Sequence, residues 1–467
     1  MPSSISRRSF LGATAAGGLG IVFAGSLEAI VRPAAAATRS AFGYGPLVPD
    51  PAGILSLPAG FSYKLVARAG VTLLESGHPT PDDTDGTGAF PRPSGSTLVN
   101  NHEISSNEPF GVPQLAGLTY DPGARGGTTN IDVDTAGNRI REYVSLAGTH
   151  TNCAGGKSPW NTWLTCEETE ARAGGSLQKS HGYVFEVDPF DQTANQNPVP
   201  LKFLGRFAHE AVVVDPETSA VYETEDASSP NGLFYRWTPP AGFTGAKGML
   251  RALATSPGGA TAGRLQAMAA SHGSRHIPDL SLAIRPGTRY DVQWVDVPDR
   301  DAATTSVRKQ FTVDQVTRSR KLEGVWWADG GAYFVASFAR LSDGSAKEHD
   351  GQVWHYEPAT ESITLTTMFG VNLDPSVDAN NYDGPDNITV SPYGGLILCE
   401  DGEGIQHLVG VTDQGKAYTL ARNDFNDSEF AGPTFSADGT ILYVGIQSPG
   451  HVFAITGPWG RPSNADV

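Results

Sequence analysis

Cysteine is scarce in this chain of 467 residues, which contains only Cys153, Cys166 and Cys399. So small and odd a number excludes a disulfide-rich scaffold and permits at most one disulfide, with one thiol left over. Cys166 and Cys399 each lie in an apolar run, where we expect small buried residues, and the sequence leaves open whether they pair. Cys153 lies in NCAGG, where we expect a loop in which packing does not account for a thiol.

Positive charge is also under-represented. The chain has 33 lysines and arginines against 50 aspartates and glutamates, a formal net charge of −17 at pH 7. A surface of this sign repels nucleic acid and anionic lipid, so neither is an expected partner. If the substrate is an anion, cations must be present at the site that binds it.

Long apolar runs and the common catalytic motifs are absent. The most apolar segment, near the N-terminus, is rich in glycine and is interrupted by Glu28, so we expect no membrane span. The chain contains no HExxH, GxSxG, P-loop or dinucleotide-binding motif. The sequence therefore gives no support for the enzyme classes that these motifs mark.

The N-terminal segment has the layout of a twin-arginine signal peptide. Arg7 and Arg8 precede a Gly/Ala-rich apolar stretch, which ends in small residues around Ala37. We therefore expect residues 1–37 to be a signal that engages the twin-arginine export machinery and delivers a folded protein to the periplasm or the medium. Its removal would take away three arginines and one glutamate, leaving 30 basic and 49 acidic side chains and a net charge of −19.

Glycine and proline are abundant, at 55 and 33 residues, which favours short strands over long helices. A weak internal repeat has the same implication, because each unit contains a strand, a turn rich in Gly, Pro or Asp, and a second β-branched or aromatic strand. The full units are residues 153–168, 210–226, 323–338, 386–401 and 431–446, and residues 91–103 match the second half of a unit. Six hairpins predict an all-β fold, a six-bladed β-propeller with loop and short helical insertions.

Two long inserts, residues 169–205 and 239–310, separate the units. We expect polar loops there that cover the blades or one mouth of the channel. Within the second insert, residues 261–272 have the spacing of a short helix. No linker divides the chain, so residues 38–467 are predicted to form a single propeller catalytic domain.

Acidic residues recur at the ends of the predicted hairpins. In an antiparallel hairpin, the start of the first strand and the end of the second lie at the same end of the ladder. One unit carries Cys153 at the start and Glu167 and Glu168 at the end. The same positions hold Glu210 with Glu225 and Asp226 in a second unit, and Asp386 with Glu400 and Asp401 in a third. If these ends converge on the propeller axis, so many carboxylates are tolerable only with metal cations between them.

The repeat does not require acidic residues, since one unit has Ala431 and Gly445 at these positions and another keeps Glu323 but ends in Ser337. This contrast favours a metal site over ordinary turn chemistry. Oxygen-rich coordination suits calcium, and the oxygens of Asn101, Glu103, Asn152 and Asn387 could add to it. A thiolate suits a transition metal, so Cys153 implies a second kind of ion.

The two histidines next to predicted ligands, His102 and His209, each precede a glutamate by one residue. Neighbouring side chains on a strand point to opposite faces, so we expect these histidines to pack or to orient rather than to bind metal.

Motifs in order across the chain resemble the PhoX family of bacterial alkaline phosphatases. They are LVNNHE, NCAGGKSPWNTWLTCEE, RFAHEAVVVD, KLEGVWW, GPDNITVSPYGGLILCEDG and EFAGPTFSADGTILYVGIQSPG, together with the twin-arginine leader. The resemblance implies a six-bladed propeller with two ferric ions and three calcium ions near its central channel. It also implies hydrolysis of phosphate monoesters outside the cytoplasm, by a protein that we expect to be a monomer.

The same resemblance suggests roles for individual residues. It implies that Cys153 is the thiolate ligand of one iron and that Glu210 and Glu323 are further iron ligands. Calcium and bridging positions would fall to Glu168, Asp386, Asn387, Glu400 and Asp401, with Glu103 as a further metal ligand. The family has an arginine two residues before the glutamate that matches Glu323. Here that residue is Lys321, with Arg320 beside it, and lysine cannot hold phosphate in a bidentate manner.

Two alternatives stay open on the sequence alone. A related propeller hydrolase, a phosphodiesterase or a calcium-dependent lactonase, would use calcium without iron and give Cys153 no role. A non-catalytic propeller stabilised by calcium would lose thermal stability on metal removal and hydrolyse no ester. In the leading hypothesis, Lys321 and Arg320 add positive charge to the transition state of phosphoryl transfer.

Overall fold

A computed structural model describes residues 42–105, 107–339 and 348–463. The predicted signal peptide, residues 1–37, lies outside the described residues. The described residues all belong to one structural unit, Pro33–Val467. No helix in these ranges is long and apolar enough to span a membrane.

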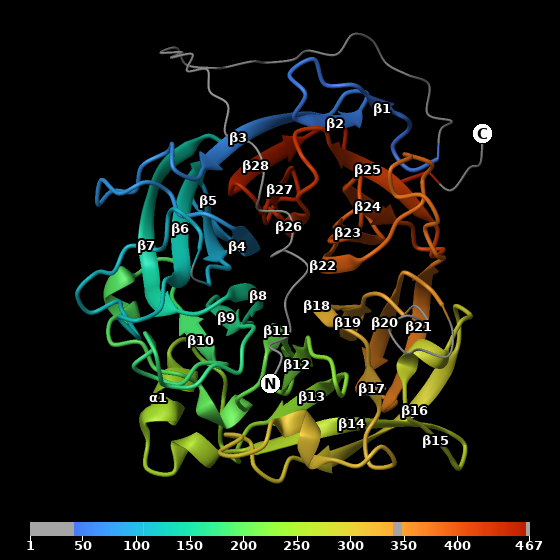
Figure 1. The fold of residues 1–467 in the computed structure, drawn as a ribbon. Coiled ribbons are helices and arrows are strands. Elements are labelled where there is room, and N and C mark those ends of the chain that lie inside the picture. The colour runs from blue at the N-terminus through green and yellow to red at the C-terminus, as the bar shows by residue number, and fades with distance from the viewer. Residues whose placement is uncertain (1–41, 106, 340–347, 464–467) are drawn as a thin grey trace. The chain divides into compact units, whose positions relative to one another are not determined.

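Hairpins of one pattern recur six times among the described residues (Figure 1). Their first strands are β4 (Thr84–Arg92), β8 (Asn152–Lys157), β11 (His209–Val214), β18 (Leu322–Ala328), β22 (Pro385–Val390) and β26 (Phe430–Phe435). Their second strands are β5 (Gly95–His102), β9 (Trp163–Glu167), β12 (Val221–Glu225), β19 (Gly331–Ala336), β23 (Leu396–Glu400) and β27 (Ile441–Ile446). Each pair is antiparallel, which confirms the hairpins predicted from the repeat.

The first strands of these hairpins lie side by side in a closed ring (Figure 1). In order around the ring, β4 contacts β8, β8 contacts β11, β11 contacts β18, β18 contacts β22, β22 contacts β26, and β26 contacts β4 again. A ring of inner strands around a centre is the arrangement of a propeller. The predicted all-β, propeller-like class is therefore correct.

A bulge near the start of each first strand interrupts the pairing register. A bulge bends its strand and changes the direction of local side chains. The second residue of the strand lies at or beside this irregularity in every case: Asp85, Cys153, Glu210, Glu323, Asp386 and Ala431. The ring thus brings six equivalent positions together, and only the last is apolar and non-ligating.

The third residue of each first strand is glycine, alanine or asparagine. At the glycines, the neighbouring strand approaches too closely to leave room for a side chain. A Cβ atom on Gly86 would lie 2.6 Å from the Cα atom of Ala154, and one on Gly324 would lie 2.9 Å from the Cα atom of Asn387. A Cβ atom on Gly432 would lie 2.3 Å from the backbone oxygen of Asp85. These contacts join consecutive strands of the ring, so glycine at these positions allows the ring to close.

Further strands extend the hairpins outward into five sheets of the described residues. They are β1 (Leu47–Val48), β2 (Leu55–Pro58), β3 (Ser62–Arg68), β6 (Gly126–Asp134), β7 (Arg139–Thr149), β10 (Val184–Val187), β13 (Gly232–Thr238), β14 (Arg264–His272), β15 (Arg275–Ile277), β16 (Arg289–Asp296), β17 (Arg318–Ser319), β20 (Gly351–Glu357), β21 (Ser362–Phe369), β24 (His407–Val411), β25 (Ala417–Asn423) and β28 (His451–Thr456).

The helices are short. One is an α-helix, α1 (Met249–Thr255), and the others are the 3₁₀ turns η2 (Gln192–Asn195), η3 (Lys202–Leu204), η4 (Gly259–Thr261), η5 (Leu280–Leu282) and η6 (Val307–Gln310).

The sheets differ in size. Two are four-stranded, β4-β5-β6-β7 and β26-β27-β28-β3, and a three-stranded sheet runs β10-β9-β8. A six-stranded sheet runs from β22 outward to β1. An eleven-stranded sheet begins at β11 and ends at β18, so both of its ends belong to the central ring. Strand pairing alone therefore does not divide the fold into six separate blades.

The predicted helix at residues 261–272 is wrong. Most of the segment is strand β14, which pairs with β13 on one side and β16 on the other. Leu265 and Met268 have helical spacing, but both are buried against neighbouring strands, and this tertiary pairing overrides the local pattern.

The predicted loop inserts are also only partly loops. Residues 169–205 contain β10, and residues 239–310 contain α1, β14, β15 and β16. Strands β14 and β16 lie on the path that joins the two ends of the eleven-stranded sheet. The second insert is therefore part of the fold and not only a cover over it.

Replacing Gly432 by alanine should destabilise the protein by about 2–4 kcal/mol, because the new Cβ atom would overlap the backbone of β4. Gly432 has φ +60°, and Gly53, an exposed turn residue, has a similar φ of +65° with open space around its Cβ position. Gly53→Ala therefore isolates the conformational cost and should lose only about 1 kcal/mol. Urea unfolding of both variants measures the difference, and equal losses would contradict the close approach.

Candidate metal centre

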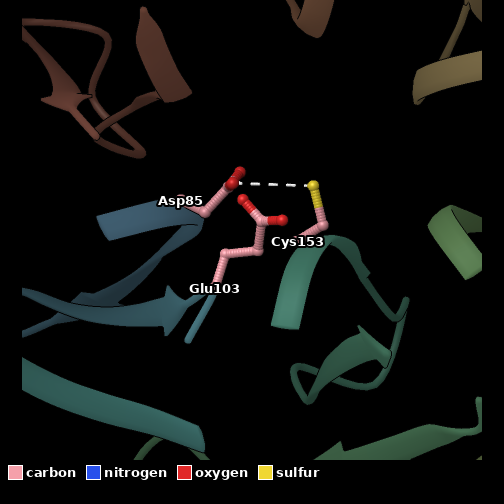
Figure 2. Close-up of side chains that lie close together, drawn as sticks. All are labelled: Asp85, Glu103 and Cys153. Atoms are coloured by element: carbon pink, nitrogen blue, oxygen red, sulfur yellow. Dashed lines mark hydrogen bonds between the residues drawn. The ribbon is translucent and has the colours of Figure 1, made fainter. Parts of the chain in front are cut away.

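Within the described ranges, side chains from the ring positions and from neighbouring turns form four overlapping groups that could hold metal ions. They are Asp85–Glu103–Cys153, Cys153–Glu168–Glu210, Glu210–Glu323–Asp386 and Asp386–Asp401–Glu429, and within each group the ligand atoms lie within 4.8 Å of one another. Figure 2 shows the first group, in which Asp85 comes from β4, Glu103 follows β5, and Cys153 comes from β8. Because neighbouring groups share a member, the donors form one continuous centre.

Cys153 lies at the junction of two of these groups. Its Sγ atom lies 3.2 Å from Oε1 of Glu210 and 3.5 Å from Oδ2 of Asp85, the contact drawn as a dashed line in Figure 2. On the other side of the first group, Nε2 of Gln447 donates to Asp85 at 3.1 Å and to Glu103 at 2.7 Å. The sulfur and the carboxylates thus converge, as the sequence predicted for Cys153 and Glu210.

The residues at the ends of the second strands have two different roles. Glu168 and Asp401 each come one residue after the strand and face the centre as members of a group. The residue before each of them, the last of the strand, faces into the blade. Glu400 is such a residue: its carboxylate accepts from the backbone N–H of Asp383 at 2.6 Å and from the N–H of His407 at 2.7 Å. Glu400 therefore belongs to none of the four groups, because alternate residues of a strand point to opposite faces, and its role as a metal ligand stays a prediction.

Burial and like charge act together on the grouped side chains. Glu210 and Glu323 are 1% and 3% exposed. Burial, followed by repulsion from Asp386 and the neighbouring carboxylates, raises the pKa of Glu210 well above its ordinary value. The pKa of Glu323 is raised by burial as well, although the Lys321 ammonium opposes the shift.

The ionised form of the Cys153 thiol is disfavoured for the same reasons as the ionised carboxylates. Burial first, and then the carboxylates of Asp85 and Glu210, raise the pKa of Cys153 well above its ordinary value. Thiolate and carboxylates can all be ionised here only if cations compensate them, which is what metal coordination supplies. The donor set of one sulfur with many oxygens therefore fits a mixture of a transition metal and hard cations.

Lys321 contributes a cation beside this centre. Its Nζ atom lies 3.2 Å from Oε1 of Glu323 and 3.8 Å from Oδ2 of Asp226. Burial alone would lower the pKa of Lys321, but attraction from Glu323 and Asp226 outweighs it and holds that pKa well above its ordinary value. The raised pKa keeps the Lys321 ammonium positively charged. Its side chain is 37% exposed, so a ligand can reach it.

The backbone at Lys321 has φ +36°, an uncommon conformation for a residue with a side chain. The preceding strand β17 pairs with the start of β13, which fixes the direction from which the chain enters β18. Such strained residues persist where the surrounding structure holds them, often at functional sites. Arg320 points elsewhere, with its Nε atom donating to the backbone oxygen of Phe338 at 3.1 Å.

Asparagines predicted as oxygen donors have other partners. Oδ1 of Asn101 accepts from Trp163 and Thr165, and its Nδ2 atom donates to the backbone of β8. Asn152 bonds through both atoms of its amide, to Thr149 and Thr165. In this structure the amides of these two asparagines are engaged in hydrogen bonds within the blades, and the expectation that they add metal-binding oxygens stays a prediction.

Asn387 lies next to the centre, where its Nδ2 atom donates to Asp386 at 2.9 Å and its Oδ1 atom accepts from the N–H of Gly432 at 2.6 Å. Both atoms of its amide thus have partners, and Asn387 belongs to none of the four groups.

The histidines behave as expected. His102 is buried, with Nδ1 2.8 Å from the backbone oxygen of Asp82 and Nε2 2.9 Å from the Thr129 hydroxyl. His209 stacks on Phe207 at a ring distance of 3.7 Å. Burial lowers the pKa of His102 to about 4 and that of His209 to about 3, so both are neutral packing residues.

None of the three cysteines, all of them among the described residues, is disulfide-bonded, and all are buried. Cys166 lies in β9 and Cys399 in β23, which belong to different sheets. We predicted a loop at Cys153, but Cys153 is the second residue of strand β8.

Sequence reasoning missed Asp85 and Glu429, and it named Asp226 among the converging acidic ends without giving it a role. Asp85 had a usable signal, because TDG at residues 84–86 matches NCA, HEA and LEG at the starts of the other first strands. The repeat was recognised only from residue 91 onward in this hairpin, so its first strand was overlooked. Glu429 lies just before β26 and has no counterpart in the repeat.

Comparison with protein families decides what kind of protein carries this centre. The model described as alkaline phosphatase PhoX matches residues 42–450, which include every member of the four groups. The chain belongs to the PhoX family of alkaline phosphatases. It is therefore a metal-dependent phosphatase that hydrolyses phosphate monoesters, and the lactonase and binding-protein alternatives are set aside.

A solved PhoX structure has the same fold. Pseudomonas fluorescens PhoX, in complex with vanadate, a transition state analogue, is 19% identical with a TM-score of 0.67, covering 92% of this chain and 100% of that one. A gluconolactonase from Xanthomonas campestris is 11% identical with a TM-score of 0.40, covering 89% of this chain and 98% of that one. No curated protein sequence matches the chain.

In metal-free protein, the buried carboxylates of the centre should lower the free energy of unfolding as the pH rises. Buried Glu210 and Glu323 keep protons that the unfolded chain releases above about pH 4.5, because their folded-state pKa values are raised from 4.5. The free energy of unfolding of metal-free protein should therefore fall by about 1–3 kcal/mol as the pH rises from 4.5 toward the alkaline range.

Urea unfolding across this pH range, with and without chelator, tests the expectation. Metal-loaded protein should lack the decrease, and Glu323→Gln should reduce it in metal-free protein, whereas the exposed Glu75→Gln should leave it unchanged. Metal-free protein whose stability rises with pH above 4.5 would show that the carboxylates are not forced together.

Proposed function

We propose that this PhoX-family phosphatase uses the four overlapping groups as a shared centre of iron and calcium that binds and hydrolyses phosphate monoesters. The observation that carries the proposal is the convergence of Cys153, Glu210, Glu323 and Asp386 from four different hairpins on one point. A buried thiol among mutually repelling carboxylates has no role in folding and suits multivalent cations.

The resemblance to the PhoX family is the basis for two ferric ions and three calcium ions, and a donor set of one sulfur with many carboxylate oxygens is compatible with both kinds of ion. Cys153 and Glu210 would hold one iron, and Glu210, Glu323 and Asp386 would complete the iron sites. Carboxylate oxygens suit calcium, and the remaining acidic members of the four groups would be its ligands: Asp85, Glu103, Glu168, Asp401 and Glu429.

Six closed inner strands support six blades. In this proposal the eleven-stranded sheet comprises two blades, one starting at β11 and the other ending at β18, joined at their outer edges by β16 and β21. The remaining sheets supply one blade each.

Export completes the proposal. The twin-arginine motif supports transport of the folded protein by the twin-arginine machinery to the periplasm or the medium, with residues 1–37 as signal and residues 38–467 as the catalytic domain. That route suits a protein whose metals are held only after folding. The mature protein would act as a monomer on small phosphate esters.

The ions and the side chains around the centre would each contribute to binding the phosphate. When bound, the ions would neutralise the charge on the phosphate and favour attack on phosphorus. Lys321, which is charged and partly exposed, would donate to a phosphate oxygen and keep the ester against the centre. Glu323 and Asp226 hold the Lys321 ammonium in place and prevent it from turning away.

Small residues of the ring leave little space between the inner strands. The space lined by Gly86, Ala154, Ala211, Gly324 and Gly432 has a volume of about 20 Å³, little more than one water molecule requires. Substrate must therefore enter and product must leave on the side that carries the carboxylates.

Cys153→Ser should lower the iron content of the purified protein and remove the visible absorption expected of a ferric thiolate. Phosphatase activity on p-nitrophenyl phosphate should fall at least tenfold. Elemental analysis and absorption spectra of wild type and variant provide the measurement. Cys399→Ala, which alters a buried cysteine in β23, is the matched control and should keep both iron and colour. A colourless wild type without iron would exclude the iron assignment.

Lys321→Met should reduce kcat/KM by about 10²–10³-fold, because a charged donor to the phosphate is lost. Lys321→Arg should retain activity with an equal or lower KM, since its planar fork can hold two phosphate oxygens. Arg320→Met should cause a smaller loss than Lys321→Met, because the Arg320 side chain is directed to the backbone of Phe338. Steady-state kinetics with p-nitrophenyl phosphate compare the three, and the reverse order for Arg320 and Lys321 would reassign the phosphate contact.

A further inference from the structure

Three hairpins end their second strand in a glutamate that is buried within the blade. These residues, Glu167, Glu225 and Glu400, are at most 1% exposed. The next residue along the chain is in each case an acidic residue of the centre or its edge: Glu168, Asp226 and Asp401.

Each buried glutamate is held by a cationic or protonatable side chain that also holds a second acid. In the first hairpin, His181 lies with Nδ1 2.6 Å from Glu167 and Nε2 3.2 Å from Asp121. The side chains of His181 and its two acids are completely buried.

The other two hairpins repeat this arrangement with different chemistry. Nη1 of Arg308 lies 3.0 Å from Glu225 and 2.7 Å from Glu170. In the third hairpin, Nδ1 of His407 lies 2.7 Å from Glu400, and its Nε2 atom lies 3.3 Å from Asp378. We call these three arrangements the strand-end clamps.

The clamps also fix the start of the next strand. Glu167 accepts from the backbone N–H groups of Gly182 and Tyr183 at 2.9 and 3.1 Å. Glu225 accepts from the N–H of Leu233 at 3.3 Å, and Glu400 accepts from that of His407. The turn that carries the centre-facing acid is thereby held at both of its ends.

Two further hairpins show that the fold does not need a clamp. Strand β19 ends in Ala336 and β27 in Ile446, and the residues that follow are Ser337 and Gln447, which are not acidic. Both hairpins have the same antiparallel pairing and the same bulge as the clamped ones. Clamps therefore occur only where an acidic residue of the centre follows.

Strand β5 is intermediate, since it ends in His102, which is held between Asp82 and Thr129, and Glu103 follows it. Here a neutral side chain replaces the buried ion pair.

Buried ion pairs are an expensive way to stabilise a fold, because desolvation offsets most of their attraction. Their restriction to these hairpins points to a different role. Since adjacent residues at a strand end point to opposite sides, holding the glutamate inward directs the next carboxylate toward the centre. We propose that His181, Arg308 and His407 are positioning residues, which through their clamps aim Glu168, Asp226 and Asp401 at the metals. This inference rests on the metal-dependent function proposed above.

The double variant Glu225→Gln/Arg308→Met tests the second clamp. Gln keeps an acceptor for Leu233 and Tyr235, and the change removes the charges of Glu225 and Arg308 together. The acid that loses its cation is Glu170, whose side chain is 25% exposed to solvent. Full-length protein loaded with metal is dialysed against increasing concentrations of chelator, and iron and calcium are measured by elemental analysis. The chelator concentration that releases half of the metal should fall about 10–100-fold relative to wild type.

A matched control removes a buried ion pair far from the centre. Arg139 and Glu142, 2.9 Å apart in the outermost strand β7, allow the corresponding double variant Arg139→Met/Glu142→Gln. It should retain metal as the wild type does, whatever its stability. Unfolding of metal-free protein in urea shows whether either change acts through the fold.

The outcomes separate the two proposals. Wild-type metal retention by the clamp variant would overturn the positioning role and leave the metal-dependent function intact. A wild type that binds no metal would overturn both. If the double variant does not fold, Arg308→Gln is measured in the same way, and a folded Arg308→Gln protein with wild-type retention would also overturn the clamp.

Discussion

Repulsion between buried acidic groups is the constraint on which this structure depends. Five of the six inner strands bring an ionisable side chain to the same point, and burial makes their coexistence in charged form unfavourable without cations. The propeller-like ring brings these groups together from distant parts of the sequence. In the function proposed above, the ions that catalysis requires also relieve this repulsion, so stability and activity would be coupled through one centre.

The geometry of the ring follows from that constraint. The groups converge only if the inner strands approach closely, and close approach requires glycine or alanine at most positions just beyond the ionisable ones. The alternation along each strand end then separates two tasks. One glutamate enters the blade and joins strands together, while its neighbour faces the centre.

Much of this arrangement could be predicted from sequence, because it is local. Turn residues between β-branched runs predicted the hairpins, and the recurrence of acidic ends predicted that Cys153, Glu210 and Asp386 would meet. Sequence reasoning was less successful in predicting which of two adjacent residues faces the centre and which faces the blade. Glu400 and Asp401 are adjacent, and only the register with β24 shows which of them faces the centre.

Partners that are distant in the sequence were beyond such reasoning. Arg308 lies in an insert without a repeat signal and reaches Glu170 and Glu225, 138 and 83 residues away. The prediction of a helix at residues 261–272 failed for a related reason. The segment is a strand because it pairs with neighbours on both sides, and its own spacing does not show this. The proposed identity of the metals comes from family resemblance, because neither spacing nor composition could distinguish one metal from another.

The pairing of β3 with β28 joins an early segment of the chain to one of its last strands. A nascent chain on the ribosome cannot complete the circle until its C-terminal portion has emerged and found its N-terminal partner. The ring of inner strands, and with it the four groups, is therefore complete only when synthesis is essentially finished. Loss of β3 or β28 would remove this closing pair, although neither strand contains a member of the four groups.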